Sequence, residues 1–288
     1  MKIYKNPALC VLFLFLLSVP AFSQKMKAED VLTNHLNSIG SKEDREKVKN
    51  QVIVSEVEVN QKGSATVVNG RAVIFSADQK SMWAMNLNSN SYPQDRFGFS
   101  GKDTKVAYST PGVRSILGDF IYLYPELLKE GLLGGTLSTS WALLNADSKQ
   151  PKLSYDGSKK INGVETHVLS YSPKSGSDLS IKMYFDKQNF QHIRTEYNRV
   201  VGARQAANID ASAGQGEDRY RIVEDFSDYK KAGDLTLPST YKISYSYSSG
   251  ASIRLQRNAN REIEWKFNIT NYSYNQEIDD NSFNIDTK

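Results

Sequence analysis

Cysteine is the scarcest residue of this 288-residue chain, because Cys10 is its only one. Cys10 stands directly after Leu9, inside the N-terminal apolar run, whereas a lipid-attachment cysteine follows that run and a small residue. The rest of the chain can form no disulfide, so its stability must come from a packed core. Thiolate ligands for a metal ion are excluded in the same way.

Excess charge of one sign is also lacking. Once the N-terminal leader described below is removed, 34 basic and 32 acidic residues remain. This near-neutral balance gives no basis for a nucleic-acid partner or for charge-driven binding to an anionic membrane. No second apolar run approaches the roughly 18 residues of a membrane span, so we expect no transmembrane segment in the mature chain.

Patterns typical of catalytic and metal sites are missing as well. The histidines His35, His167 and His192 are not paired at ligand spacing and belong to no HExxH motif. Glu224 and Asp225 are adjacent, so in a strand their side chains point to opposite faces and form no catalytic pair. We therefore predict a protein that is not an enzyme and that binds no metal and no cofactor.

An export signal is the clearest feature that the chain does have. Lys2 and Lys5 precede an almost unbroken apolar run from Ala8 to Leu17. The tripeptide 21–23 (Ala-Phe-Ser) then places small residues where a signal peptidase requires them. We expect cleavage after this tripeptide, a periplasmic location, and a single mature domain over residues 24–288.

Most of the mature chain alternates apolar and polar residues as antiparallel strands do. Tyrosine and isoleucine alternate with lysine and serine over 241–247, and 262–269 repeats the pattern with tryptophan and phenylalanine. One apolar and one wet face indicate an antiparallel sheet with a single buried side. Asn69-Gly70 predicts a hairpin turn before a return strand at 72–75. The segment 203–218 predicts a mobile loop.

Helical patterns occur at 26–39, at 43–49 and in an insert over 111–145, where Pro125 divides two short helices. The glycine-rich stretch 131–135 ends the second of these and is either a hinge or a tight turn. A long one-sided sheet with so few covering helices is predicted to curve strongly around them.

Three segments of the chain resemble LolA/LolB-like proteins, the periplasmic carriers of outer-membrane lipoproteins. Two of them are "MYFDKQNFQHIRTEY" (183–197) and "YNQEIDDNSFNI" (274–285). The third, "HLNSIGSKEDREKVKN" (35–50), is similar to the opening of uncharacterised exported proteins that are grouped with this superfamily. The resemblance implies a mainly β fold with a few helices: an unclosed half-barrel of about eleven antiparallel strands, lidded by helices over an apolar cavity. In the true carriers the cavity holds acyl chains, and a strand arginine helps to latch the lid.

Large apolar residues allow two interpretations: ordinary core, or the lining of a cavity left open in the concave face. The candidate ligand-lining residues are Trp83, Phe97, Phe99, Leu117, Phe120, Ile121, Leu127, Leu128, Trp141, Tyr245, Trp265 and Phe267.

Three functions follow from these patterns. The leading hypothesis is an exported, non-enzymatic carrier or sensor that binds a lipid, an acyl chain or a lipidated protein, with outer-membrane lipoprotein sorting as one form of it. A second is an envelope scaffold that binds a protein partner and has no ligand cavity. A third is a secreted hydrolase, which would need His167 or His192 beside a serine and an acid.

Overall fold

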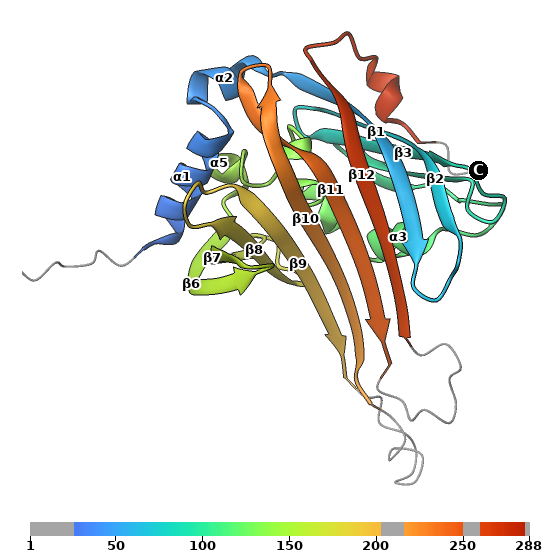
Figure 1. Ribbon diagram of the computed structural model, residues 1–288. Coiled ribbons are helices and arrows are strands. Elements are labelled where there is room, and N and C mark those ends of the chain that lie inside the picture. Colours follow the sequence, from blue (N-terminus) through green and yellow to red (C-terminus); the bar gives the residue numbers. More distant parts are fainter. Residues whose placement is uncertain (1–25, 203–215, 250–259, 286–288) are drawn as a thin grey trace, which may run out of the picture.

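The structure is a computed structural model that describes residues 26–202, 216–249 and 260–285 (Figure 1). The predicted signal peptide at 1–23 and residues 203–215 of the predicted loop lie outside the described residues. The last residue of that predicted loop, Asp218, already belongs to a strand.

The described helices are short and occur in three places: before the first strand, between residues 116 and 149, and after the last strand. Ser41 and Ser115 begin two of them, because each serine hydroxyl accepts the backbone N–H three residues later. The helical segments are α1 (Ala28–Ile39), α2 (Lys42–Lys47), α3 (Ile116–Leu123), α4 (Glu126–Lys129), η1 (Gly135–Leu137), α5 (Ala146–Lys149) and η3 (Asp280–Phe283).

Twelve strands form one antiparallel sheet within the described ranges. Their order across the sheet is β5-β4-β3-β2-β1-β12-β11-β10-β9-β8-β7-β6, so β5 and β6 are edges and the barrel stays open. The predicted mainly β, unclosed antiparallel fold is confirmed, with twelve strands where about eleven were expected. The strands are β1 (Asn50–Gln61), β2 (Val67–Ala77), β3 (Lys80–Leu87), β4 (Gln94–Phe99), β5 (Thr104–Val106), β6 (Lys152–Ile161), β7 (Val164–Ser172), β8 (Ser180–Asp186), β9 (His192–Val201), β10 (Asp218–Ala232), β11 (Leu235–Ser248) and β12 (Asn260–Tyr274).

The hairpin predicted at Asn69-Gly70 is wrong, because both residues lie inside β2. Gly70 pairs with Leu87 of β3, and a Cβ at Gly70 would lie 2.1 Å from the carbonyl oxygen of Asn86. This glycine therefore permits a close approach of two strands instead of a turn. The chain turns earlier, at Lys62 and Gly63, where the φ of Gly63 is +87°.

The convex face of β2 and β3 is covered by the C-terminal segment. Phe283 and Ile285 pack with Met82 and Ala107 in a cluster separate from the main core. Lys80 forms an ion pair with Asp280 of η3 at 2.7 Å. This segment therefore stabilises the outer side of the sheet and leaves the concave side to other elements.

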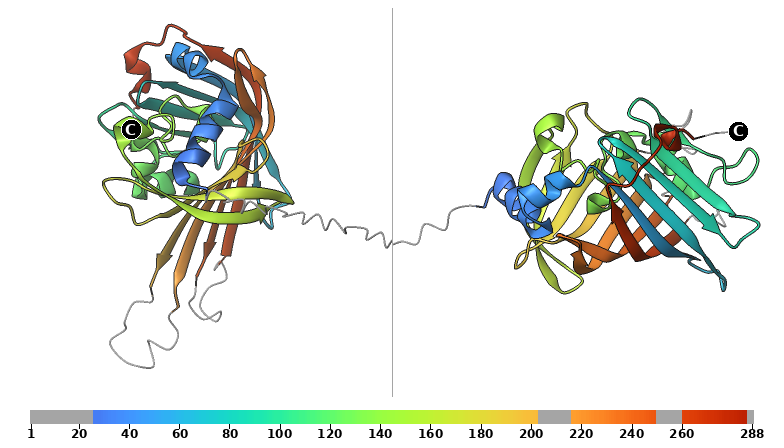
Figure 2. Two further views of the ribbon diagram at one scale, coloured as in Figure 1. Left: turned by 90° about the vertical axis from the view of Figure 1, so that its left-hand side faces the viewer. Right: turned by 90° about the horizontal axis from the view of Figure 1, so that it is seen from above.

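The concave face is covered by α1 and by the insert between β5 and β6 (Figure 2). Val31, His35 and Ile39 form the buried face of α1, which contacts β6 and β11. The irregular part of the insert after α4 is as deeply buried as the strands beneath it. Its most buried apolar side chains are Leu132, Leu133, Leu137, Trp141, Ala142 and Leu143.

Candidate functional site

All twelve predicted ligand-lining residues lie in one hydrophobic cluster on the concave side. Each is at least nine-tenths buried, from Phe97 at 0% exposure to Tyr245 at 8%. Trp83 stacks on Phe97 with ring centroids 5.8 Å apart, so part of this set packs directly on itself. Two members also face a pocket: Trp265 lines the serine pocket described next, and Phe99 lines a shallow surface hollow. Ligand lining by the twelve residues stays a prediction.

A pocket of about 520 Å³ lies where the ends of β1 and β12 meet the loop before α3. This volume falls in the range of small-molecule sites, roughly 300–1,000 Å³. We call it the serine pocket, because five serines and two threonines belong to its lining, together with apolar side chains. It is lined by Val59, Gln61, Ser64, Thr66, Val68, Ser89, Ser91, Tyr92, Ser109, Thr110, Val113, Arg114, Ser115, Ile116, Ile263 and Trp265.

A hydrogen-bond network fixes one wall of the serine pocket. The indole Nε1 of Trp265 donates to the hydroxyl of Tyr92 at 3.1 Å, and Tyr92 donates to Asp95 at 2.7 Å. Ser115 donates to the same Asp95 oxygen. Burial of this carboxyl raises its pKa to about 6. The hydroxyl of Ser109, 5% exposed, is buried and has no hydrogen-bond partner among the described residues.

Arg114 is the one charged side chain among the described residues that line the serine pocket. Its guanidinium lies over the rings of Tyr108 and Tyr122, at 4.7 and 3.9 Å from their centroids. Cation–π contacts of this kind hold a guanidinium in place without neutralising it. Among the described residues, the lining of the pocket therefore combines apolar side chains, several hydroxyl groups and a single positive charge.

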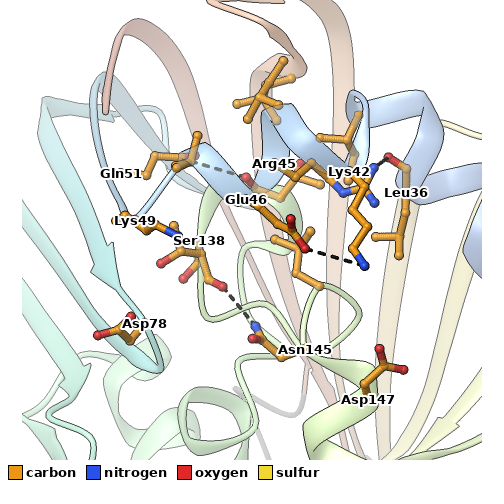
Figure 3. A pocket seen from close by; sticks show the side chains of 17 residues that line it. Leu36, Lys42, Arg45, Glu46, Lys49, Gln51, Asp78, Ser138, Asn145 and Asp147 are labelled. Carbon is orange, nitrogen blue, oxygen red and sulfur yellow. Dashed lines mark hydrogen bonds and ion pairs between the residues drawn. The ribbon is translucent and has the colours of Figure 1, made fainter. Parts of the chain in front are cut away.

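A second pocket, of about 530 Å³, opens beneath α1 and α2 (Figure 3). We call it the helix pocket. Lys42, Arg45 and Glu46 of α2 lie on one side of it, and Asn145 and Asp147 of the insert lie on the other. Arg45 donates to the carbonyls of Leu36 and Gly40 and so caps the end of α1. Both signs of charge occur here, so the helix pocket has no selective attraction for an ion.

The two pockets lie at opposite ends of the concave face. Gln51 of β1 lines the helix pocket, whereas Val59 of the same strand lines the serine pocket. Eight residues of strand span roughly 26 Å. The insert lies between the two ends, and its Thr136, Ser138 and Leu144 form part of the helix-pocket wall. The insert therefore lies between the two pockets.

A buried carboxyl anchors the insert to the concave face of the sheet. Glu224 of β10 is fully buried, and its Oε1 accepts the backbone N–H of Gly134 at 2.6 Å. Tyr197 and Tyr241 also place their hydroxyls on this carboxyl, Tyr197 at 2.6 Å. Burial raises the pKa of Glu224 to about 7, although its hydrogen bonds oppose that shift. The carboxyl is thus poised to change protonation near neutral pH.

Glu224 and the carbonyl of Leu132 compete for the proton of the Tyr197 hydroxyl. The single O–H of Tyr197 lies within hydrogen-bond distance of Glu224 Oε2 and of the Leu132 carbonyl, at 2.6 and 2.8 Å. It can donate to only one of them at a time. A protonated Glu224 can donate to Tyr197, which leaves the Tyr197 proton for Leu132. Protonation of Glu224 therefore makes the Tyr197 proton available to the insert, whereas ionisation of Glu224 strengthens the bond that it accepts from the Gly134 N–H.

The histidines lie away from any serine–acid arrangement in the structure's described part. His35 and His192 are buried in the core with ring centroids 6.0 Å apart, and Trp141 stacks on His192. Burial lowers the pKa of His35 to about 4 and that of His192 well below its ordinary value. The Nδ1 atom of His167 lies 3.1 Å from the hydroxyl of Tyr155. Over the same residues, no cluster of three or more His, Cys, Asp or Glu side chains is placed to hold a metal ion.

In the sequence, Glu224 stands out only as a neighbour of Asp225. The two side chains do point to opposite faces: Glu224 is inside, and Asp225 accepts from Arg194 at 2.7 Å outside. The signal for an internal site was the row Ile222, Glu224 and Phe226, in which an acid occupies a position of the buried face. Tyr197 and Asp95 carried no comparable signal.

The fold and its pockets define an unclosed half-barrel with an apolar concave face. Among solved structures, the chain is similar to a LolA superfamily protein from Nitrosomonas europaea, with 11% identity, a TM-score of 0.47, and coverage of 90% of this chain and 98% of that one. It is also similar to a putative outer membrane lipoprotein-sorting protein domain from Vibrio parahaemolyticus, with 12% identity, a TM-score of 0.46, and coverage of 89% and 97%. No family model and no curated protein matches the chain. The predicted resemblance to LolA-like proteins thus has counterparts among solved structures, and these similarities concern the fold alone.

No helix in the described ranges is long and apolar enough to cross a membrane.

Proposed function

We propose that this protein is an exported, non-enzymatic carrier that holds one amphiphilic molecule in the serine pocket. The carrying observation is that apolar side chains and serine and threonine hydroxyls line the same pocket, together with the guanidinium of Arg114. Val59, Val68 and Ile263 accept the alkyl part of the ligand, and the serines with Arg114 accept its headgroup. A lipid or a lipidated protein has this chemistry, and lipoprotein sorting is the form of carriage that the sequence resemblance implies.

Burial of alkyl carbons supplies the affinity. Each methylene transferred from water into an apolar site contributes about 0.8 kcal/mol. Hydrogen bonds from the hydroxyl groups mostly replace bonds to water and so contribute less. Affinity is therefore expected to rise with chain length, while Arg114 favours a headgroup with negative charge.

A fluorescent long-chain fatty acid tests the proposal by titration. Val113 lines the serine pocket and is 58% exposed, so Val113→Glu should fold normally while it introduces a charge at the pocket. We expect saturable uptake by the wild type and at least tenfold weaker binding by Val113→Glu.

Val200→Glu is the matched control, because Val200 is 49% exposed on β9 and does not line the pocket. This variant should bind as the wild type does. Absence of saturable uptake, or equal weakening by both substitutions, would contradict the proposal. In that case the scaffold hypothesis predicts a protein partner captured by crosslinking in cells.

A further inference from the structure

Two hydroxyl groups of the serine pocket are held by one buried carboxyl. Tyr92 and Ser115 both line the pocket, and both donate to the same oxygen, Oδ2 of Asp95. Asp95 belongs to β4, is 1% exposed and is not part of the lining itself. While this carboxyl is ionised, it engages both hydroxyl protons, so neither is available to a molecule in the pocket.

The other oxygen of Asp95 determines where a proton can reside. Oδ1 is buried without a hydrogen-bond partner among the described residues, and a Cβ on Gly118 would lie 3.3 Å from it. A proton on Oδ1 would therefore be a buried donor without an acceptor, which is costly. The proton of a neutral Asp95 is better placed on Oδ2, where the two hydroxyl oxygens lie within reach.

Ser115 can accept that proton. Its oxygen accepts the backbone N–H of Gly118 at 2.8 Å, and a hydroxyl oxygen has a second lone pair. When Asp95 donates to Ser115, Ser115 can no longer donate to Oδ2, so its own O–H requires a new acceptor. Tyr92 can keep its bond to Oδ2 meanwhile. Because Ser115 lines the serine pocket, an oxygen of a bound headgroup can be that new acceptor.

The charges around this carboxyl act in the same direction. Burial, and to a smaller extent the charge of Asp119 on α3, raises the pKa of Asp95 to about 6. The pKa of Tyr92 is raised well above its ordinary value, also mainly by burial, so Tyr92 keeps its proton near neutral pH. An ionised Asp95 places a negative charge behind the hydroxyls and opposes the attraction of Arg114 for an anion. A neutral Asp95 removes that opposition.

We propose that Asp95 regulates the serine pocket through its own proton. Protonated Asp95 releases the Ser115 O–H to an acceptor on the ligand and contributes no charge. Ionised Asp95 withholds that O–H and repels an anionic headgroup. This inference rests on the proposed carrier function and adds a regulation to it: the pocket holds an anionic amphiphile more tightly in acid than at neutral pH.

Ligands whose own charge does not change with pH test the inference. Decanesulfonate is a permanent anion with acceptor oxygens, and decyltrimethylammonium is a permanent cation without an acceptor. Isothermal titration calorimetry should show that the wild type binds decanesulfonate about tenfold more tightly at pH 5 than at pH 7.5. Decyltrimethylammonium should bind no more tightly at pH 5, because it gains neither a hydrogen bond nor a relief of repulsion.

Asp95→Asn removes the titrating group and should bind decanesulfonate equally at both pH values. Asp119→Asn is the matched control, because Asp119 is a neighbouring carboxyl that is exposed and does not line the pocket. This variant should keep the preference for acid.

Nuclear magnetic resonance of the Asp95 carboxyl in the wild type provides a second measurement if Asp95→Asn does not fold. Coupling between proton and ligand is reciprocal, so decanesulfonate should raise the pKa of Asp95 by about one pH unit.

Three results would overturn the inference: equal affinity of the wild type for decanesulfonate at both pH values, a preference for acid that persists in Asp95→Asn, or a pKa of Asp95 that decanesulfonate leaves unchanged. Fatty-acid uptake that is sensitive to Val113→Glu, without a preference of decanesulfonate for acid, would refute this inference while the carrier function stands. Absence of saturable binding of both ligands would contradict the carrier function as well.

Discussion

The backbone N–H of Gly134 donates to the buried carboxyl of Glu224 across ninety positions of sequence. This bond joins an irregular loop to the middle of a twelve-stranded sheet. Its consequence is that the insert is held on the concave face of the sheet by a titratable group. The stability of the insert and the protonation of Glu224 are therefore expected to vary together.

The stability of the protein should depend on pH through Glu224. Burial raises the pKa of this group from 4.5 to about 7, so the folded state holds its proton more tightly than the unfolded state does. The free energy of unfolding that Glu224 contributes is therefore largest below pH 4.5 and declines as the pH rises to about 7. The decline is roughly 3 kcal/mol, at about 1.36 kcal/mol per pH unit.

Glu224→Gln isolates this contribution. The carboxyl of Asp95, whose pKa burial raises to about 6, adds a decline of the same sign, whereas buried His35 and His192 lower the stability as the pH falls below 6.5. These groups are present in both proteins and cancel in the difference. Denaturant unfolding from pH 4.5 to 7.5 should show the wild type losing stability relative to Glu224→Gln. A constant difference would contradict the assignment.

Gly134→Ala should destabilise the insert by more than backbone strain alone. The φ of Gly134 is +86°, and its Cβ would lie 2.5 Å from Trp83. Gly112 has a φ of +76° with nothing within 4 Å of its Cβ, so Gly112→Ala carries the strain without the clash. We expect about 1 kcal/mol for Gly112→Ala and an additional 1–3 kcal/mol, roughly, for Gly134→Ala. Equal losses in thermal unfolding would mean that Trp83 does not confine the insert.

Gly70→Ala tests the close approach of β2 and β3. Its Cβ would lie 2.1 Å from the Asn86 carbonyl, so the strands must separate or β2 must bend. We expect a loss of roughly 1–3 kcal/mol and a lower Tm. Gly202, with nothing within 4 Å of its Cβ, provides the control, and Gly202→Ala should leave the Tm unchanged. A wild-type Tm in Gly70→Ala would refute this explanation of the missing turn.

Trp265 should report ligand in the serine pocket. It lines that pocket and donates to Tyr92, whereas Trp141 lies inside the core against His192. Binding of an unlabelled fatty acid is expected to change the tryptophan emission of the wild type and of Trp141→Phe. The change should vanish in Trp265→Phe. A change that survives in Trp265→Phe would place the ligand elsewhere.

The sequence predicted the sheet because apolar alternation is a local property. The rows 241–247 and 262–269 became β11 and β12, and their apolar residues face the core. Asn69-Gly70 misled the prediction because the glycine is required by the close approach of β3 and not by a turn. A turn and a close approach both require glycine, and local sequence does not distinguish them.

The site was less predictable than the fold. The acid at Glu224 in a buried row was visible, but its partners come from β9, β11 and the insert, which only the folded chain brings together. The serine pocket likewise joins residues as far apart as Val59 and Trp265. Aromatic composition indicated a large core and did not indicate which side chains would face an opening.

Native mass spectrometry of the protein purified from the envelope without detergent tests the carrier function most directly. We predict a population whose mass exceeds that of the polypeptide by one amphiphile, with an acyl chain identified after extraction. Loading should fall in Val113→Glu and persist in Val200→Glu. A bare polypeptide mass in every preparation, together with no saturable uptake of added fatty acid, would contradict the account.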